Sequence, residues 1–285
     1  MKKLLLGLFL MVSALSFSAE RVVKMENAYV DDKGIVYVIG EKTPFTGIVE
    51  NYKVPPISEG DSVLEGKIPF KNGVIEGSSK LYYPSGKLAS VATFKNGKVE
   101  GVQKDYYENG NLKRELPHKN GIINGIVKEY YPNGILRSEG NYLLGAKHGI
   151  SKMYYENGKL QSEAIFKNGV LDGVQKDYTV DGKLLRELPF KYNQVNGLAK
   201  FYNEQTGKLE YETVYVDNMR EGLSKKYYPS GKLLSEVIFK KDKEEGILKA
   251  YYESGKPQGE IPYKNGLIHG TVKRYDENGK VIEQV

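Results

Sequence analysis

Apolar and polar positions along this chain alternate in short runs that return every 24 residues. In the copy at 149–172, the segment 150–155 holds Ile, Met and two Tyr, and the segment 160–166 holds Leu, Ala, Ile and Phe. These residue types favour β-strands. The residues 156–158 (Glu-Asn-Gly) and 168–169 (Asn-Gly) that follow the two segments are typical of tight turns. Each copy therefore predicts a β-hairpin joined to the next hairpin by another tight turn.

A glycine opens each of nine copies. Every interval is 24 residues except one of 25, where Gln205 or Thr206 lengthens a turn. The opening glycines are Gly77, Gly101, Gly125, Gly149, Gly173, Gly197, Gly222, Gly246 and Gly270. Such a period indicates an array of one supersecondary unit. With Gly47 as a degenerate tenth start, we predict an all-β fold, an elongated array of about ten tandem antiparallel β-hairpins that forms a twisted single-layer meander sheet.

Tyrosine fills the sixth position of every copy, counted from the glycine. These position-six tyrosines are Tyr82, Tyr106, Tyr130, Tyr154, Tyr178, Tyr202, Tyr227, Tyr251 and Tyr275. Lysine fills the fourth position of every copy, so Lys152 and Tyr154 share one face of a strand. Because aromatic rings bury large areas and gain from cross-strand neighbours, we expect the position-six tyrosines to form a structural ladder that holds the ribbon together.

The seventh position points to the opposite face and is less strictly kept. It holds Thr179, Asn203 and Asp276 in three copies and tyrosine in the other six, which are Tyr83, Tyr107, Tyr131, Tyr155, Tyr228 and Tyr252. A single-layer sheet cannot bury both of its faces, and an exposed face with aromatic residues is a plausible docking surface. These six tyrosines are therefore the candidate partner contacts.

Two hairpin registers are compatible with the sequence. A three-residue loop that ends in a left-handed glycine sets Tyr154 opposite Leu160 and gathers the apolar positions on one face. A four-residue loop sets Lys152 opposite Glu163 as an ion pair. We favour the first because register follows the buried face, although it places Lys104 opposite Arg114, so both registers stay open.

The chain divides into three parts. Residues 1–19 have a charged start, a short apolar stretch and a small-residue exit, which is the layout of a secretory signal peptide. Residues 20–46 lead into the array, and 47–285 form it. We therefore expect export through the secretory pathway to the periplasm, the cell surface or the medium. Pro55-Pro56 and the stretch 58–62 interrupt the repeat as an insertion.

Composition excludes several kinds of chemistry. The chain has no cysteine, which rules out disulfides and thiol ligands. Without Lys2 and Lys3, 40 basic residues stand against 36 acidic ones, a mild positive imbalance that is spread evenly along the chain and forms no basic cluster for nucleic acid. The three histidines, His118, His148 and His269, lie far apart in the sequence, and no nucleotide-binding or hydrolase motif occurs. We expect no catalytic, metal or cofactor site, and no enzyme activity.

The units G-x-x-K-x-Y-Y-x-N-G-x-L-x-x-E and F-K-N-G-x-x-x-G resemble the MORN repeat variant of bacterial proteins over roughly residues 34–285. Departures lie at Lys241-Asp242 and at Pro257. The resemblance implies a β-hairpin array without enzymatic activity that serves as a scaffold for protein or membrane contacts. Many relatives carry the label of YwqK-like antitoxins, which implies binding of a toxin, although an export signal fits poorly with a cytosolic antitoxin.

We therefore expect a non-catalytic exported scaffold that binds another protein, with many weak contacts summed by avidity. One alternative is an antitoxin or immunity-like protein that sequesters one toxin. The other is a binder of envelope glycan or anionic lipid, which the row of lysines would favour and the recurring glutamates oppose. The sequence does not set the oligomeric state.

Overall fold

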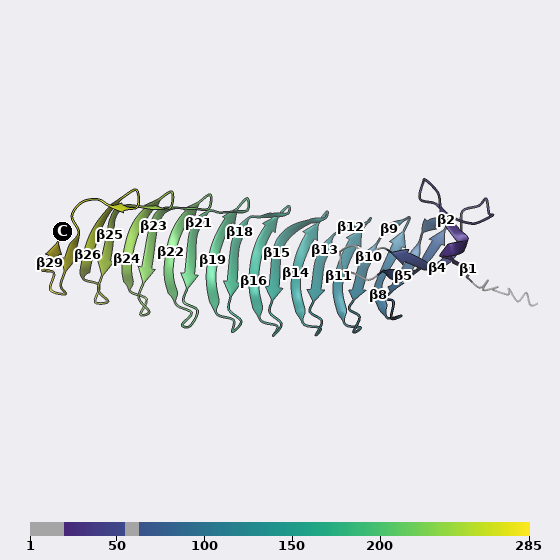
Figure 1. The fold of residues 1–285 in the computed structure, drawn as a ribbon, viewed down its shortest axis with the longest axis horizontal. Coiled ribbons are helices and arrows are strands. Elements are labelled where there is room, and N and C mark those ends of the chain that lie inside the picture. The colour runs from purple at the N-terminus through teal and green to yellow at the C-terminus, as the bar shows by residue number, and fades with distance from the viewer. Residues whose placement is uncertain (1–19, 55–62) are drawn as a thin grey trace, which may run out of the picture.

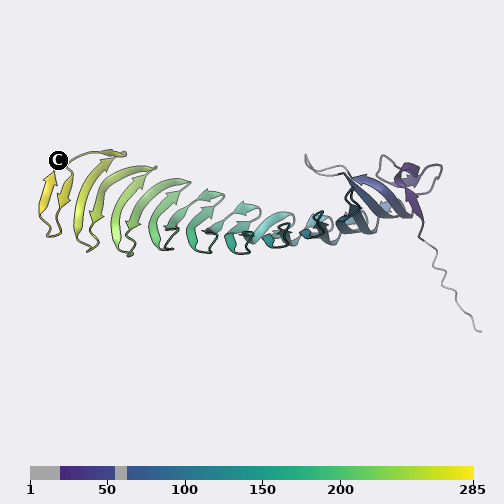
Figure 2. The ribbon, with the colours of Figure 1, turned by 60° about the horizontal axis from the view of Figure 1, so that its bottom comes forward.

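The computed structural model describes residues 20–54 and 63–285. These residues form an elongated ribbon of hairpins laid side by side from the N-terminal to the C-terminal end (Figure 1). In Figure 2 the strands near the C-terminal end are seen along their full length and those near the middle are foreshortened, so the sheet twists along its axis. The predicted signal peptide and the 55–62 insertion lie outside the described residues.

Ten hairpins make up the array, each with a leading and a returning strand that pair antiparallel. The leading strands are β4 (Gly47–Val54), β7 (Gly77–Tyr82), β10 (Gly101–Tyr106), β13 (Gly125–Tyr130), β15 (Ala146–Tyr154), β18 (Gly173–Tyr178), β21 (Gly197–Tyr202), β23 (Met219–Tyr227), β25 (Lys243–Tyr251) and β28 (Lys273–Tyr275). The returning strands are β5 (Leu64–Lys71), β8 (Leu88–Lys95), β11 (Leu112–Lys119), β14 (Leu136–Leu143), β16 (Leu160–Lys167), β19 (Leu184–Lys191), β22 (Leu209–Val216), β24 (Leu233–Lys240), β26 (Pro257–Lys264) and β29 (Val281–Gln284).

Successive hairpins are joined by short strands of two residues. These are β6 (Val74–Ile75), β9 (Lys98–Val99), β12 (Ile122–Ile123), β17 (Val170–Leu171), β20 (Gln194–Val195) and β27 (Leu267–Ile268). In β15, β23 and β25 the joining residues belong to the leading strand itself. The predicted all-β meander is confirmed, and the helical structure of the described residues is one 3₁₀ turn, η1 (Met25–Asn27).

Both predicted turns form with the backbone angles that their residues favour. Gly158 has a φ of 82°, and its N–H donates to the carbonyl of Tyr155 at 2.9 Å. Asn168 and Gly169 have φ values of 52° and 82°, the two positive angles of a type I′ hairpin turn. Lys241 and Asp242, which replace Asn-Gly, keep the same conformation with φ values of 48° and 65°.

The hairpin register combines the two alternatives. Tyr154 lies opposite Leu160 and Lys152 lies opposite Glu163, because the register shifts by one residue between them. The extra residue is Gln161 on the returning strand, which forms a β-bulge. The expectation that Lys104 opposes Arg114 is wrong, since Lys104 pairs with Glu115.

The expectation that the apolar positions gather on one face is wrong, because of the same bulge. The extra residue exchanges the two faces for the rest of the returning strand. Each side chain after Gln161 therefore lies on the face opposite to the one it would occupy without the bulge. Phe166 therefore pairs with Gly149, on the face away from Tyr154 and Leu160. The aromatic residues near the ends of the returning strands and the position-six tyrosines do not gather on one face.

A compact hydrophobic core occurs at the N-terminal end of the ribbon. It consists of Ala28, Val36, Phe45, Val49, Ile68 and Phe70. The hairpin of β2 (Ala28–Val30) and β3 (Val36–Val38) contributes to it, and β1 (Val22–Lys24) pairs in parallel with β4. This part of the chain covers the first strand of the array, in the right half of Figure 1.

Candidate functional site

One face of the sheet carries a continuous row of alternating charge across its strands. Lys152 lies opposite Glu163, and Glu163 also lies opposite Lys176 of the next hairpin. We call this face the ladder face. The row runs through Lys104, Glu115, Lys128, Glu139, Lys152, Glu163, Lys176, Glu187, Lys200, Glu212, Lys225, Glu236, Lys249, Glu260 and Lys273.

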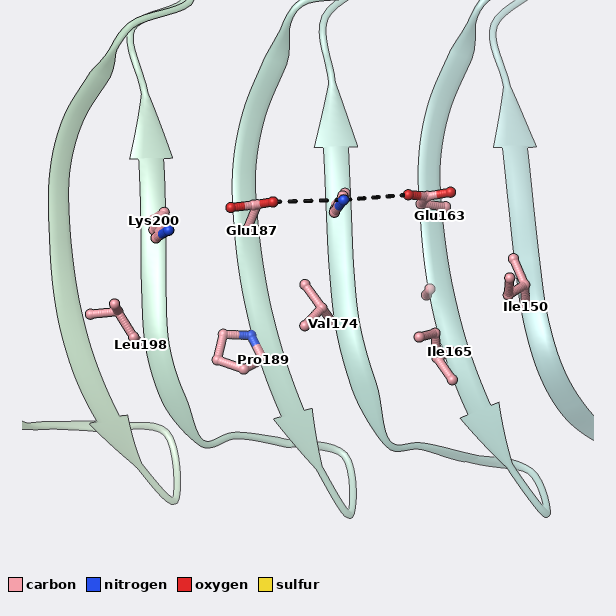
Figure 3. A pocket seen from close by; sticks show the side chains of 10 residues that line it. Ile150, Glu163, Ile165, Val174, Glu187, Pro189, Leu198 and Lys200 are labelled. Carbon is pink, nitrogen blue, oxygen red and sulfur yellow. Dashed lines mark ion pairs between the residues drawn. The ribbon is translucent and has the colours of Figure 1, made fainter.

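The ion pairs of this row are half exposed. The Nζ of Lys176 lies 4.0 Å from Glu163 and 3.7 Å from Glu187, one on each side (Figure 3). The Nζ of Lys104 lies 3.4 Å from Glu115. Exposed pairs of this kind each contribute at most about 1 kcal/mol. Because lysines and glutamates alternate along the whole row, the row offers little net positive charge.

The position-six tyrosines bind the same glutamates from the ladder face. The hydroxyl of Tyr154 donates to Glu139 of the preceding hairpin at 2.9 Å, and that of Tyr227 donates to Glu212 at 2.7 Å. Burial, followed by the hydrogen bond to the carboxylate, raises the pKa of Tyr154 and of Tyr227 to about 12. The rings are half-buried.

The position-seven tyrosines form another set of bonds between hairpins. The hydroxyl of Tyr131 donates to the backbone carbonyl of Tyr154 in the next hairpin at 2.7 Å. The same bond is formed from Tyr83, Tyr107, Tyr155, Tyr228 and Tyr252. These hydroxyls are therefore already engaged inside the array, which gives the residues a structural role. Contact with a partner through their half-buried rings stays a prediction.

Beside the charged row, the ladder face carries a band of apolar side chains that the sequence analysis did not single out. Ile150 is 55% exposed and lies opposite Ile165, which is 42% exposed. The equivalent positions in the other hairpins extend the band over most of the ribbon, with one polar interruption at Asn141, opposite Ile126. We call it the apolar stripe: Val102, Pro117, Ile126, Ile150, Ile165, Val174, Pro189, Leu198, Val214, Leu223, Ile238, Ile247 and Pro262.

The charged row and the apolar stripe line a shallow groove in the middle of the ribbon. Its volume is about 570 Å³. Figure 3 shows Glu163 and Glu187 along one side, and Ile165, Val174 and Pro189 along the other. The groove is open to solvent and apolar over most of its width. Such a surface suits a docked polypeptide, because the polypeptide's apolar side chains can pack on the stripe and its polar groups can bond to the charged row.

The opposite face is tightly packed in places, but it also holds a groove of about 340 Å³ whose lining includes Val127, Met153 and Phe166. Ala199 and Thr213 are at most 1% exposed. Arg114 binds Asp105, with 2.5 Å between Nη2 and the carboxylate, and Phe201 stacks on Tyr211 at 4.2 Å between ring centroids. Ile126 and Ile150 of the ladder face are 56% and 55% exposed, compared with 44% for Met153 on the opposite face.

The described residues contain no group of three or more His, Cys, Asp or Glu residues placed to hold a metal ion. His118 bonds within its own hairpin, with its Nδ1 2.8 Å from the carbonyl oxygen of Leu116. Over residues 20–54 and 63–285, no helix has the length and apolar character needed to cross a membrane.

A single sheet built from tandem hairpins, each bonded mainly to its neighbours, defines a linear repeat scaffold. The family model for the MORN repeat variant matches seven segments that together cover just over half of the chain, and the protein belongs to this family. The matched segments are 75–96, 99–120, 123–143, 147–168, 220–241, 244–265 and 268–285. The hairpins between 173 and 216 fall outside these matches but have the same register. No curated protein matches the chain.

Half of the apolar stripe has a signal in the sequence. The second position of a copy is apolar in seven of the nine, as in Val102, Ile126 and Ile150, with Ser78 and Thr271 the exceptions. What was missing was the register, because the partner of each residue on the returning strand depends on the bulge at residues such as Gln161.

Proposed function

We propose that this protein is a non-catalytic repeat scaffold that binds another protein along its ladder face. The observation that carries the proposal is the apolar stripe, whose members Ile126, Ile150 and Ile247 are 56%, 55% and 51% exposed. Isolated exposed apolar residues are common, but a contiguous apolar band beside polar groups is typical of an interaction surface. Repetition allows one extended partner to make the same contact several times, so weak contacts add.

The row of lysines supports a protein partner more than a lipid surface. Between Lys104 and Lys273 every lysine of the row has a glutamate opposite it on at least one side. This arrangement cancels much of the attraction for an anionic membrane or polymer. A toxin sequestered in the manner of an antitoxin would be one case of a protein partner, and its hallmark would be a single stoichiometric complex. The sequence of residues 1–19 supports export as the route by which the scaffold reaches that partner.

Capture with a matched variant tests the proposal. The protein carrying Ile126→Ser, Ile150→Ser and Ile247→Ser should lose a partner that the wild type captures from envelope extract, secreted proteins or host-cell membranes. The captured protein is then purified and its affinity measured at low and moderate salt. The control is Val180→Ser, because Val180 is 52% exposed but lies in a turn outside the stripe.

One stoichiometric protein that survives the salt change and is lost on the triple substitution supports the proposal. Diffuse, salt-labile capture of membranes would contradict it and favour lipid binding by the lysines. Equal capture by the wild type and the triple variant would also contradict it, because the stripe would then make no contribution.

A further inference from the structure

The glutamate that would continue the charged row beyond Lys104 is missing, and we call this position the gap. Elsewhere each glutamate of the row lies between two lysines and accepts a tyrosine hydroxyl. Glu163, for example, lies opposite Lys152 and Lys176 and accepts the hydroxyl of Tyr178 at 3.4 Å. Val91 occupies the equivalent position one hairpin before Glu115. Val91 therefore has the neighbours that surround a glutamate elsewhere, but it has no carboxylate.

The groups that would bind this carboxylate are all in place. Val91 lies opposite Lys80 on one side and Lys104 on the other. Tyr106 follows Val91 by 15 residues, the separation at which Tyr178 bonds to Glu163. Seven position-six tyrosines donate to a glutamate, which are Tyr130, Tyr154, Tyr178, Tyr202, Tyr227, Tyr251 and Tyr275. Among the described residues, the hydroxyl of Tyr106 has no hydrogen-bond partner and Lys80 has no ion pair.

The charges next to the gap add to its positive potential. Lys67, rather than a glutamate, lies directly opposite Lys80. Like charges in this position destabilise a sheet, so an external anion between the lysines would be favoured. The carboxylates on this end of the ladder face are Glu65, which lies opposite Tyr82, and Glu50, which lies opposite Lys24. In the described part of the chain neither forms an ion pair with Lys80 or Lys104.

We propose that Lys80, Lys104 and the Tyr106 hydroxyl bind a carboxylate side chain from an acidic segment of a protein partner, laid over Val91. The same three groups bind a glutamate side chain elsewhere in this sheet, which favours a carboxylate as the ligand. This proposal rests on the proposed function, because it assumes that a protein partner lies on the ladder face. The apolar stripe begins at Val102, on the same strand as Lys104. An extended partner with an acidic end and apolar residues beyond it would contact both features.

Replacing Val91 by glutamate gives the sharpest test. Val91→Glu supplies the missing carboxylate from within the chain, as in seven other hairpins, so the variant should fold and unfold at the wild-type temperature or higher. A fluorescent hexaglutamate peptide should bind the wild type at low salt. Val91→Glu should weaken that binding about tenfold or more, as expected for the loss of charge-assisted hydrogen bonds. The control Val91→Gln has the size of glutamate without its charge and should bind close to wild type.

Lys80→Gln tests the same site by removing a ligand-binding group, and it should also weaken hexaglutamate binding. Three results would overturn the proposal: no binding of hexaglutamate to the wild type, equal binding to Val91→Glu, or binding of phosphatidylglycerol vesicles while hexaglutamate stays free. The captured partner separates this proposal from the proposed function. If the triple stripe variant loses that partner and Val91→Glu keeps it, the acidic contact is wrong and the scaffold function stands.

Discussion

At the scale of single residues, the array depends on a few side chains that repeat one bond in most hairpins. The position-seven tyrosines illustrate this. Their hydroxyls donate to the carbonyl that ends the next leading strand, at 2.6 to 2.7 Å. Where tyrosine is absent, Thr179, Asn203 and Asp276 instead accept backbone N–H groups of their own turns. The residue at position seven therefore forms a hydrogen bond either to the next hairpin or within its own turn.

Tyr131→Phe should therefore destabilise the array without changing its fold. The substitution removes one hydrogen bond to the Tyr154 carbonyl and keeps the ring. The expected loss is about 1 kcal/mol in the free energy of unfolding, measured by urea denaturation. A variant as stable as the wild type would show that this bond contributes nothing, and the ring of Tyr131 would then be free to act mainly as a partner contact.

Two turns contain bulky residues in a backbone conformation that suits asparagine or glycine. Tyr192 has a φ of 51° and is 70% exposed, and Leu144 has a φ of 52° and is 75% exposed. Asparagine fills this position in other turns, for example at Asn168. Tyr192→Asn and Leu144→Asn should each stabilise the protein by about 1 kcal/mol, seen as a higher melting temperature. A decrease in either variant would mean that the exposed side chain makes a stabilising contact.

At the scale of the hairpin, the sequence predicts some features well and others poorly. Asn-Gly at 168–169 and Gly158 define the turns because few other residues adopt positive φ values. The sequence leaves two registers open because a bulge at Gln161 has no strong sequence signal. The bulge decides which face Phe166 occupies and which residue lies opposite Ile150. The apolar stripe and the gap at Val91 could be located only after the register was known.

The hydrogen bonds between position-six tyrosines and glutamates make the hairpins sensitive to alkaline pH. The pKa of Tyr154, Tyr202 and Tyr227 is raised to about 12, first by burial and then by the carboxylate. The unfolded value is near 10. A raised folded-state pKa means that the neutral hydroxyl contributes stability fully below about pH 10, and that this contribution is lost as the pH rises towards 12.

Urea denaturation at successive pH values should show stability falling between about pH 10 and about pH 12, in parallel with the appearance of tyrosinate absorbance. Tyr154→Phe should show a smaller fall, because one titrating group is gone. If the tyrosines of the folded protein titrate together near pH 10, their hydroxyls are not held by the glutamates as described.

At the scale of the whole molecule, the array is a linear series of interchangeable units. Each hairpin pairs with its neighbours, and the compact core lies at the N-terminal end. Stability should therefore be a sum of unit and interface contributions. The period of 24 residues predicted this organisation from the sequence. The repeat period does not identify the binding partner, because every copy repeats the same structural residues.

Deleting one full unit should shorten the ribbon without unfolding it. Removal of residues 149–172 joins Gly173 to His148, which restores the repeat in phase. The product should keep its β-sheet circular dichroism, have a smaller maximum dimension by small-angle scattering and unfold at a somewhat lower urea concentration. Removal of 149–160 takes out half a unit and should destabilise the array strongly. Equal effects from both deletions would contradict the modular architecture.

Binding of a partner to the ladder face can be measured directly, because the chain contains no native cysteine. Ile150→Cys places a thiol on the ladder face, and Met153→Cys places one on the opposite face of the same strand, where Met153 is 44% exposed. Each variant is labelled with a thiol reagent, with and without the purified partner. The partner should slow labelling at 150 and leave labelling at 153 unchanged. Protection at 153 alone would contradict binding to the ladder face.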